Sequence, residues 1–560
     1  MTKTLSLFLL LLLPFLGKAD ITDWYKIKAD KSGNIYVLGA YNGRVTIGPY
    51  SFGDSLIYPT PITTGYFLAK YDSSGTLLRA DSIIGISSNC FGPCPGSVGM
   101  VIDNENNVII SMASGDNTIY RGTSYYRPNI LKLDTGGNVI LAKHIGSPYF
   151  TETDISVDGR NNIYYASTFS DTVTSDTVSI HSCDSTSFKT FVVKMRPDGT
   201  TMWIKEIASS IAGYTISLQE CYFITTDTLG NSFVGGMTDN TIAFGSDIFS
   251  CAGFYPFLAK LDSNGNPVFL KGYLDSWFGG PGGATHSYLS DACISKAQKL
   301  YVGGSFRDTV HVGPSGIVVT NSNVVTPYLG NTDINNGNAN WYQYNQLLST
   351  TSLDNRLYSV SADNNDNTFI VGDISDSIYY FNGSGLSTLV TNPSRSYFAK
   401  FNPSGNFHCY NTDSARLIAG TAYGSNYYTV GISTSDTYMS NYLIRRDAIK
   451  IIKWDGANCM PVWKNSINDD IWIISENVSG QENEKKSCSF IPNPSSNGVF
   501  MPKINSNLHY AIEVFDLLGK KIVSVDDHIA VDISFCAKGL YIYKVIFDDK
   551  SMISGKILYQ

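Results

Sequence analysis

A short pattern returns along most of the chain and limits the folds that the chain can adopt. Each copy has an acidic or polar residue, a turn rich in Asn and Gly, and a run of β-forming residues. The copies begin at residues 30, 103, 158, 227, 295, 363 and 424. Their mean interval of about 66 residues has room for four short strands with loops. The sequence therefore predicts a repeat architecture built from β-sheets.

The turn of this pattern explains most of the regularly spaced carboxylates. An Asp stands at the start of five copies, namely Asp30, Asp103, Asp158, Asp227 and Asp363. Asp before Asn or Gly supplies side-chain hydrogen bonds to a tight turn. A calcium loop at 363–374 is disfavoured, because Thr368 and Ile374 stand where such a loop needs Gly and a bidentate Glu. We expect no metal site and no cofactor.

A second pattern follows each copy and places a lysine at equivalent positions. These are Lys70, Lys132, Lys194, Lys260, Lys400 and Lys453, and the fifth copy, near Pro327 to Trp341, is degraded. One hypothesis is a ring of lysines that binds a ligand. We favour a second hypothesis, in which each lysine lies at a strand end and its charge protects an edge from aggregation.

The two patterns together resemble the repeats of a bacterial β-propeller family of secreted proteins. The alternation is D-x-x-G-N-[IVF]-[YF]-V-x-G followed by F-[LV]-[AV]-K-x-D-x-x-G. The resemblance implies an all-β chain with a β-propeller over residues 20–465, and seven copies favour seven four-stranded blades. Six or eight blades and a β-solenoid remain open. This family has no shared catalytic residues.

The first 19 residues have the pattern of a secretory signal peptide. Lys3 precedes an apolar run from Leu5 to Leu16, and Gly17 and Ala19 are small residues at the expected cleavage site. We expect cleavage near Ala19. No later run reaches about 18 apolar residues, so no transmembrane segment is expected in the mature chain.

Export permits disulfides among the ten cysteines. Cys90 and Cys94 flank a Gly-Pro turn, and Cys488 and Cys536 share the C-terminal segment. Spacing alone does not fix the connectivity.

The composition changes after Trp463. Residues 466–487 are mostly polar and are expected to form a linker, and the short β-runs of 488–560 predict a small Ig-like β-sandwich. This last segment resembles the C-terminal sorting domain of the type IX secretion system of Bacteroidetes. The resemblance implies export across the outer membrane, a location outside the cell or on its surface, and the secretion machinery as partner. The matching residues are Pro492, Asn493, Pro494, Gly498, Phe500, Leu518, Gly519, Lys520, Gly539, Leu540, Tyr541, Lys556, Ile557 and Leu558.

Charge and motifs exclude several function classes. The chain has 40 basic and 48 acidic side chains, a formal net charge of −8, which does not suit a nucleic-acid backbone binder. It contains no nucleophile elbow, no S-x-x-K, no H-E-x-x-H and no P-loop. The seven histidines are scattered. No catalytic residue is assigned, and whether the chain is an enzyme is left open.

Aromatic residues in expected loops are the candidate ligand-binding residues, because Tyr and Trp offer large contact areas at low entropic cost. They are Tyr125, Tyr126, Trp277, Phe278, Trp341, Tyr342, Tyr427 and Tyr428. The leading hypothesis is a secreted or surface-displayed propeller that binds glycan or extracellular protein, as in adhesion. The alternatives are a secreted hydrolase or lyase on polysaccharide, with an acid pair near the propeller axis, and a structural surface-layer component. The ligand, surface attachment and the oligomeric state stay open.

Overall fold

The computed structural model describes most of the chain from Tyr25 onward, and within the described residues every regular element is a β-strand. The all-β prediction is therefore confirmed there, whereas the predicted signal peptide lies outside them. The chain forms two compact units, residues 1–434 with 447–470, and residues 435–446 with 471–560. The described ranges are 25–42, 45–52, 64–85, 98–112, 117–146, 152–182, 188–207, 209–210, 219–239, 241–249, 255–272, 288–307, 309–312, 316–319, 325–344, 355–373, 378–381, 386–389, 396–413, 415–439, 442–469, 472–474, 487–491, 495–505, 509–516, 520–526, 530–548 and 552–559.

The first unit contains, within these ranges, seven antiparallel sheets that each include four strands in chain order. The strands of the first four are β1 (Tyr25–Ala29), β2 (Ile35–Asn42), β5 (Thr64–Tyr71) and β6 (Leu77–Gly85); β7 (Val98–Ile102), β8 (Val108–Met112), β11 (Ile130–Leu133) and β12 (Val139–Lys143); β13 (Thr153–Val157), β14 (Ile163–Phe169), β17 (Lys189–Met195) and β18 (Thr201–Ile207); β20 (Gln219–Thr226), β21 (Ser232–Thr238), β24 (Tyr255–Leu261) and β25 (Pro267–Gly272). Those of the last three are β26 (Tyr288–Ile294), β27 (Leu300–Arg307), β30 (Val325–Thr332) and β31 (Ala339–Tyr344); β32 (Arg356–Ala362), β33 (Thr368–Asp373), β36 (Ser396–Phe401) and β37 (Phe407–Asp413); β38 (Arg416–Tyr423), β39 (Asn426–Met439), β40 (Tyr442–Asp455) and β41 (Pro461–Asp469).

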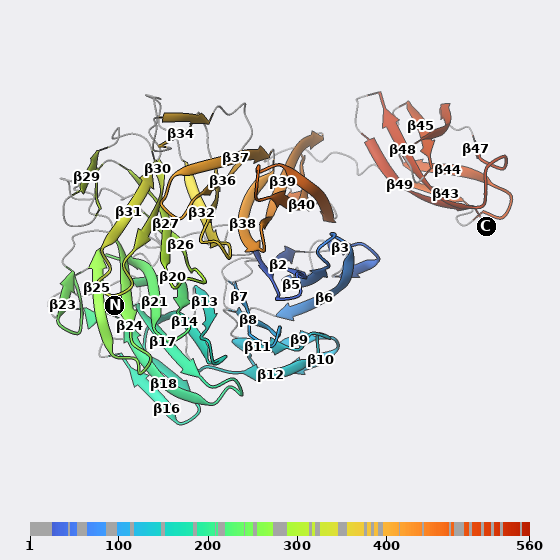
Figure 1. Cartoon of the computed structure of the whole chain (residues 1–560). Helices are drawn as coiled ribbons and strands as arrows, with labels where there is room; N and C mark the ends of the chain where they lie inside the picture. Colours follow the sequence, from blue (N-terminus) through green and yellow to red (C-terminus); the bar gives the residue numbers. More distant parts are fainter. Residues whose placement is uncertain are drawn as a thin grey trace, which may run out of the picture. The chain divides into compact units, whose positions relative to one another are not determined.

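The first strands of these sheets form a closed ring. Each of β1, β7, β13, β20, β26, β32 and β38 contacts the next, and β38 contacts β1. Figure 1 shows the sheets following one another around a common axis, with the orange β38 returning to the blue β2. Such a ring of radial four-stranded sheets is a β-propeller.

The hydrophobic core lies between neighbouring sheets. Ile35, Tyr36, Val37 and Leu38 on β2 are all fully buried. Ile35 and Val37 pack in one cluster with side chains of the seventh sheet, whereas Tyr36 and Leu38 pack in another with the second sheet. A strand buried on both faces needs no alternation of apolar and polar residues, which is why these runs are continuously apolar.

A hairpin stands between the second and third strands of the first six repeats, which explains why a repeat is longer than four short strands require. Three of the hairpins pair with a strand that precedes them in the ring: β9 pairs with β6, β22 with β19, and β3 with β41. The last pairing joins the N-terminal hairpin to the seventh sheet and covers its outer edge. The strands concerned are β3 (Val45–Ile47), β4 (Tyr50–Phe52), β9 (Thr118–Tyr120), β10 (Thr123–Tyr125), β15 (Thr172–Ser175), β16 (Val178–His181), β19 (Ser209–Ser210), β22 (Ile242–Phe244), β23 (Asp247–Phe249), β28 (Thr309–Val312), β29 (Gly316–Val319), β34 (Ile378–Phe381) and β35 (Leu386–Leu389).

The repeated aspartates hold the turns between first and second strands, as predicted. Asp30 Oδ1 accepts hydrogen bonds from the backbone N–H groups of Ser32 (2.8 Å) and Asn34 (2.9 Å), and Oδ2 accepts one from the Asn34 side chain (2.7 Å). Gly33 completes the turn at φ 83°. The same Asp-to-Asn bonds recur at the other four aspartates.

The repeated lysines join each sheet to the next. Lys194 on β17 lies over the ring of Tyr164, its cross-strand neighbour, with Nζ 5.0 Å from the centroid. Its ammonium crosses to the fourth sheet and donates to the Ser263 carbonyl at 2.8 Å. Equivalent bonds run from Lys70 to Thr135, Lys132 to Pro197, Lys260 to Ile334, Lys400 to Gly456 and Lys453 to Ser73.

The predicted position near a strand end is confirmed, but the predicted protection of an edge is wrong, because each lysine lies on the third strand, between two others. Lys132, Lys194, Lys260 and Lys400 are buried, which does not favour a ring of lysines open to a ligand. Burial lowers the pKa of Lys194, although the nearby Asp158 carboxylate opposes this shift. The bond from Lys453 to Ser73 links the seventh sheet to the first and so closes the ring.

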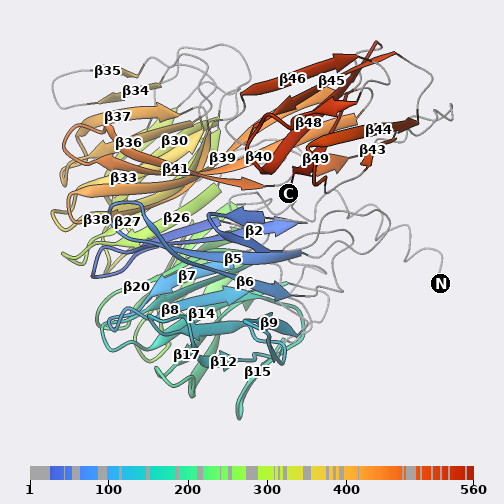
Figure 2. The same ribbon diagram turned by 90° about the vertical axis from the view of Figure 1, so that its right-hand side faces the viewer.

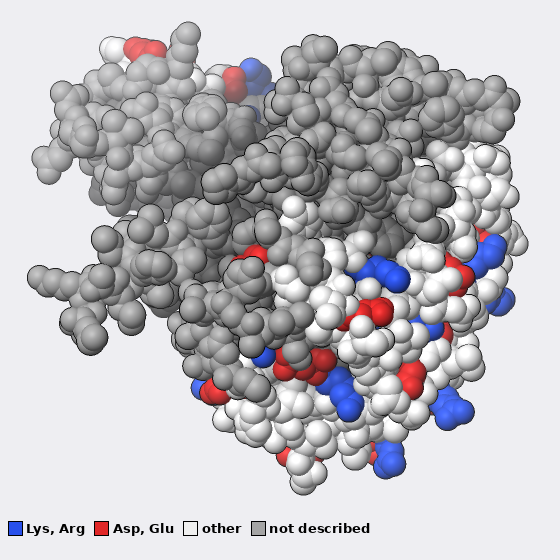
Figure 3. Space-filling view, turned by 90° about the vertical axis from the view of Figure 1, so that its left-hand side faces the viewer, with Lys and Arg blue, Asp and Glu red and all other residues white. Residues whose placement is uncertain are grey.

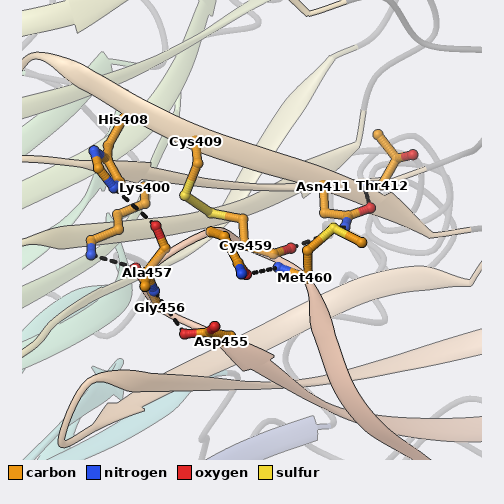
Figure 4. Close-up of a disulfide and its surroundings, with 11 residues drawn as sticks. Lys400, His408, Cys409, Asn411, Thr412, Asp455, Gly456, Ala457, Cys459 and Met460 are labelled. Carbon is orange, nitrogen blue, oxygen red and sulfur yellow. Dashed lines mark hydrogen bonds between the residues drawn. A yellow bond between two sulfur atoms is a disulfide. The ribbon is translucent and has the colours of Figure 1, made fainter.

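One disulfide reinforces the junction between the sixth and seventh sheets (Figure 4). Cys409 on β37 is bonded to Cys459 in the turn between β40 and β41, with Cα atoms 5.9 Å apart. Next to it, Lys400 Nζ donates to the Gly456 carbonyl, and Asn411 Nδ2 donates to the Cys459 carbonyl at 2.9 Å. The disulfide expected from export is present, but this pairing was not anticipated.

Of the cysteine pairs considered from sequence, Cys90 and Cys94 lie outside the described residues. Cys536 has a free thiol, so the considered bond between Cys488 and Cys536 is not formed.

The second compact unit contains a four-stranded sheet in the order β46-β45-β48-β49 and a three-stranded sheet in the order β43-β44-β47 (Figure 2). Side chains of both sheets, including Phe500, Val514 and Tyr541, share one core. The strands of these two sheets are β43 (Ser487–Ile491), β44 (Val499–Asn505), β45 (Tyr510–Phe515), β46 (Lys521–Asp526), β47 (Val531–Asp532), β48 (Gly539–Phe547) and β49 (Met552–Tyr559). The short strand β42 (Trp472–Ile474) belongs to neither sheet and pairs with residues 443–445 of β40.

Lys194→Met is expected to lower the free energy of unfolding by about 2–3 kcal/mol, because it removes a charged hydrogen bond and a cation–π contact from a buried site. Urea unfolding of the mature chain measures the change. Lys205→Met is the matched control, since Lys205 is exposed on the adjacent strand β18. Equal midpoints for the two variants would contradict the role given to Lys194.

Reduction is expected to lower the urea midpoint of the wild-type chain. The disulfide spans a sequence separation of 50 residues, and closing a loop of that length restricts the unfolded chain by about 4 kcal/mol. The double variant Cys409→Ser, Cys459→Ser should already have the lower midpoint and should lose little more on addition of reductant. A variant that responds to reductant as strongly as the wild type would show that the stabilising bond lies elsewhere.

Candidate functional site

An exposed aromatic cluster lies where β10 ends and next to the end of β12. Tyr126 is 69% exposed. The ring of His144 meets it edge-on at 5.5 Å, and the Arg127 guanidinium lies 5.8 Å from its centroid. His144 Nδ1 is 2.7 Å from the Arg127 carbonyl oxygen, and the Arg127 N–H donates to Asn117 Oδ1 at 3.3 Å. These contacts fix the exposed ring of Tyr126 next to the Arg127 guanidinium.

The backbone of this cluster is strained. Arg127 has φ 38°, in the left-handed region that a non-glycine residue rarely adopts. Tyr125, the last residue of β10, is half-buried and packs against the core between the first two sheets. It therefore supports Tyr126 rather than presenting a second open ring. No sequence motif links His144 to Tyr126 and Arg127, since His144 lies 17 residues from Arg127 in the chain.

The other predicted aromatic contacts are distributed differently. Tyr427 and Tyr428 lie on β39 and are fully buried, so their placement in an exposed loop is wrong; their rings fill the core around the seventh sheet. Trp341 and Tyr342 lie on β31 and are half-buried, and the Trp341 ring is 5.9 Å from Tyr301. Trp277 and Phe278 lie outside the described residues. Among the described candidates only Tyr126 is exposed, and the half-buried Tyr125 lies next to it in the chain.

A second polar cluster lies where the inner strands begin. The Tyr222 hydroxyl on β20 donates to Glu220 Oε2 at 2.7 Å. Burial raises the pKa of Glu220, the bond from Tyr222 opposes this, and the Asp239 carboxylate adds to it. On the next inner strands, the Arg356 guanidinium lies 5.5 Å from the ring centroid of Tyr288. Glu220 and Tyr222, Tyr288, and Arg356 thus lie near the beginnings of three successive inner strands, β20, β26 and β32.

The cluster continues at β38. Arg416 Nε lies 2.8 Å from Asp373 Oδ2, and the Tyr358 hydroxyl donates to the same oxygen at 2.8 Å. Arg416 also donates to the Tyr358 hydroxyl. Burial raises the pKa of Asp373, and the Arg416 guanidinium opposes that shift. Asp373, Tyr358 and Arg416 thus form hydrogen bonds with one another.

The described aspartates of the inner strands have structural partners. Asp154 Oδ2 accepts the Ile224 N–H at 3.0 Å, and Asp291 Oδ2 accepts the Val360 N–H at 2.8 Å. Each bond reaches the next inner strand where that strand has a β-bulge. Bulges leave backbone groups unpaired, and the carboxylates supply the missing acceptors. An inter-sheet role explains both aspartates.

Among the described residues on the face drawn in Figure 3, basic and acidic side chains are few and are interspersed among uncharged atoms. In the described ranges, no group of three or more His, Cys, Asp or Glu side chains could hold a metal ion. The same part of the chain contains no helix suited by length and hydropathy to crossing a membrane.

The residues of the predicted sorting motif that the structure describes have several roles. Phe500 is buried in the core of the second unit. Gly498 has φ 77°, and a Cβ there would lie 2.6 Å from the Ser534 Cα, so the fold requires glycine. Tyr541 is buried and donates to the Ala537 carbonyl. Pro492, Asn493, Pro494, Leu518 and Gly519 lie outside the described residues.

Comparison with solved structures gives distant likenesses. BamB from Moraxella catarrhalis is 10% identical, with 83% of this chain and 99% of that chain covered and a TM-score of 0.26. The extracellular domain of the one-component system BT4673 from B. thetaiotaomicron is 10% identical, with 96% and 80% covered and a TM-score of 0.19. Drosophila Semaphorin 2a is 8% identical, with 96% of both chains covered and a TM-score of 0.32. The fold assignment rests on this chain's own sheet topology, since likenesses of this size carry no argument.

A search of curated proteins gave no match. A family model does match the end of the chain: residues 489–560 match "Secretion system C-terminal sorting domain". The resemblance noted in the sequence is thereby confirmed, and residues 489–560 are a sorting domain of the type IX secretion system.

Proposed function

We propose that this protein is a seven-bladed β-propeller that is exported by its C-terminal domain and binds a glycan or an extracellular protein. The sorting domain carries the proposal, because it implies secretion or display on the outer cell surface. In this proposal the seven sheets of the ring are its blades, the sandwich of the second unit is Ig-like, and residues 1–19 are a cleaved signal peptide.

The cluster around Tyr126 supports a binding role on the propeller. A tyrosine face that is open to solvent and fixed by its neighbours loses little entropy on binding. The adjacent Arg127 adds a planar donor for carboxylate or carbonyl oxygens. Adhesion through this surface needs no catalytic group, in keeping with the absence of the common catalytic motifs from the sequence.

A hydrolase or lyase acting on polysaccharide is the second candidate, and Glu220 is the observation that favours it. A carboxyl group whose pKa burial raises is suited to act as a general acid. Glu220 is the second residue of β20, one of the first strands that form the ring. Its partner Tyr222 orients the carboxyl group.

Deletion of residues 488–560 is expected to leave the chain in the periplasm of a bacterium that has the type IX system. The deleted segment contains the whole sorting match, while the first compact unit retains its sheets. Accessibility to protease added outside intact cells measures surface display. Normal display of the truncated chain would refute the sorting role.

Tyr126→Ala is expected to weaken binding at least tenfold, because it removes the stacking surface of the exposed cluster. The full mature chain is screened first against glycan and extracellular-protein arrays, and the variant is then titrated against any specific partner. Leu229→Ala is the matched control, since Leu229 is also strongly exposed but lies in a turn. Unchanged affinity of the Tyr126 variant would place the binding site elsewhere. If the chain instead releases soluble products from a polysaccharide, and Glu220→Gln abolishes that release, the result would favour the hydrolase or lyase.

A further inference from the structure

The Arg127 side chain beside the exposed Tyr126 ring has hydrogen-bond donors that the protein does not use. Within the described residues its guanidinium contacts the Tyr126 ring and forms no hydrogen bond or ion pair, and the residue is exposed. A guanidinium carries five N–H donors in one plane and matches the two oxygens of a carboxylate. Arg127 is therefore suited to bind a carboxylate that lies next to the tyrosine ring.

His144 adds a polar atom on another side of the same ring. Its Nδ1 lies 2.7 Å from the Arg127 carbonyl oxygen. Because a carbonyl oxygen can only accept, the hydrogen of the neutral imidazole is on Nδ1, and Nε2 is left as an acceptor. His144 is exposed, so Nε2 can accept a hydrogen bond from a hydroxyl group of a ligand.

The backbone that carries these side chains is held firmly. The Asn129 N–H donates to the Lys143 carbonyl at 2.8 Å, and the Ile145 N–H donates to Asn129 Oδ1 at 2.8 Å. Gly146 exchanges two backbone hydrogen bonds with Thr174 on β15 of the third repeat, at 2.7 Å and 2.8 Å. Asn129 and Ile145 are fully buried. A ligand at this cluster thus meets groups that are already in place, which lowers the entropic cost of binding.

The charges around the cluster leave one cation without a carboxylate. Arg121, on the same hairpin as Tyr126, is paired with Asp81 at 2.7 Å, and Lys143 is paired with Asp176. Among the described carboxylates none is paired with Arg127. The whole chain has a formal net charge of −8 and does not attract anions in general. An anionic ligand would therefore depend on Arg127 in particular.

The three groups together match a sugar that carries a carboxylate. Such a sugar is one rigid unit with a flat C–H face for the Tyr126 ring, a carboxylate for Arg127 and hydroxyl groups for His144. In an acidic peptide these features would come from separate side chains, each of which loses conformational freedom on binding. The exposed single ring, 69% open to solvent, also suits a flat sugar face better than a peptide anchor that needs a deep apolar pocket.

We propose that the cluster of Tyr126, Arg127 and His144 binds an acidic glycan, with a uronate residue stacked on Tyr126 and its carboxylate paired with Arg127. This inference rests on the proposed binding function of the propeller and names the chemical class of its ligand. Tyr126 supplies affinity for the sugar ring, whereas Arg127 selects the acidic sugar over its neutral counterpart.

The test measures the affinity of the full mature chain for oligomers of galacturonate, glucuronate and mannuronate, and for the same oligomers with each carboxyl group reduced to an alcohol. Arg127→Gln removes the cation and keeps a side chain of similar polarity. Arg196→Gln is the matched control, because Arg196 is also exposed but lies in the turn between β17 and β18. It changes the net charge of the chain by the same amount. Equal urea midpoints for the two variants show that both fold.

We expect the wild-type chain to bind a uronate oligomer at least tenfold more tightly than its reduced form, since a hydrogen-bonded charge pair is lost. Arg127→Gln should lose at least tenfold in affinity for the uronate form and change by less than about twofold for the reduced form. Tyr126→Ala should weaken both forms, and Arg196→Gln should match the wild type.

Three results would overturn the inference, and they differ in what they leave standing. Equal affinity for the acidic and reduced oligomers would overturn the acidic class and keep glycan binding. Binding of an extracellular protein but of no glycan, lost in Tyr126→Ala, would replace the glycan by a protein and keep the proposed function. Binding of neither glycans nor extracellular proteins would overturn the proposed function as well.

Discussion

The junctions of the propeller share one interaction, a lysine ammonium that each of six sheets extends to a turn of the next sheet, and in four of the six the lysine is buried. A lysine on the third strand lies over an aromatic ring or beside an aspartate, and its Nζ reaches a turn carbonyl of the next sheet. Desolvating such a charge is costly unless hydrogen bonds replace water. Because the needed acceptor belongs to the neighbouring sheet, satisfying the charge fixes the angle between the two sheets.

The interactions that join neighbouring sheets differ from one junction of the ring to the next. The fifth sheet has Asn331 where the others have lysine, and its junction instead has an ion pair between Lys299 and Asp366 at 3.1 Å. The sixth junction has both Lys400 and a disulfide. Ring closure itself uses the bond from Lys453 to Ser73 and the pairing of β3 with β41. A rigid ring built in this way leaves the connections between strands free to vary in length and sequence.

The patterns that could be read locally were predicted well. The bonds made by Asp30 lie within four residues and depend only on the turn, so the spacing of Asp, Gly and Asn revealed them. The lysines were visible as a repeat, but their role was missed because their acceptors lie in the next sheet. The placement of Tyr427 and Tyr428 in a loop failed for a related reason: a buried strand residue and a loop aromatic have the same composition, and only packing distinguishes them.

The sequence by itself determined the all-β class, the repeat, its turns and the sorting domain, because hydrophobic runs, turn residues and motifs act over short distances. Tertiary structure alone decided which side chains of a motif point outward, as with Leu540 against Tyr541. It also decided that Cys409 meets Cys459, and that Tyr126 lies exposed beside His144 whereas Tyr427 and Tyr428 are buried. These outcomes depend on which strands become neighbours, and that is fixed by the closure of the whole ring rather than by any local stretch.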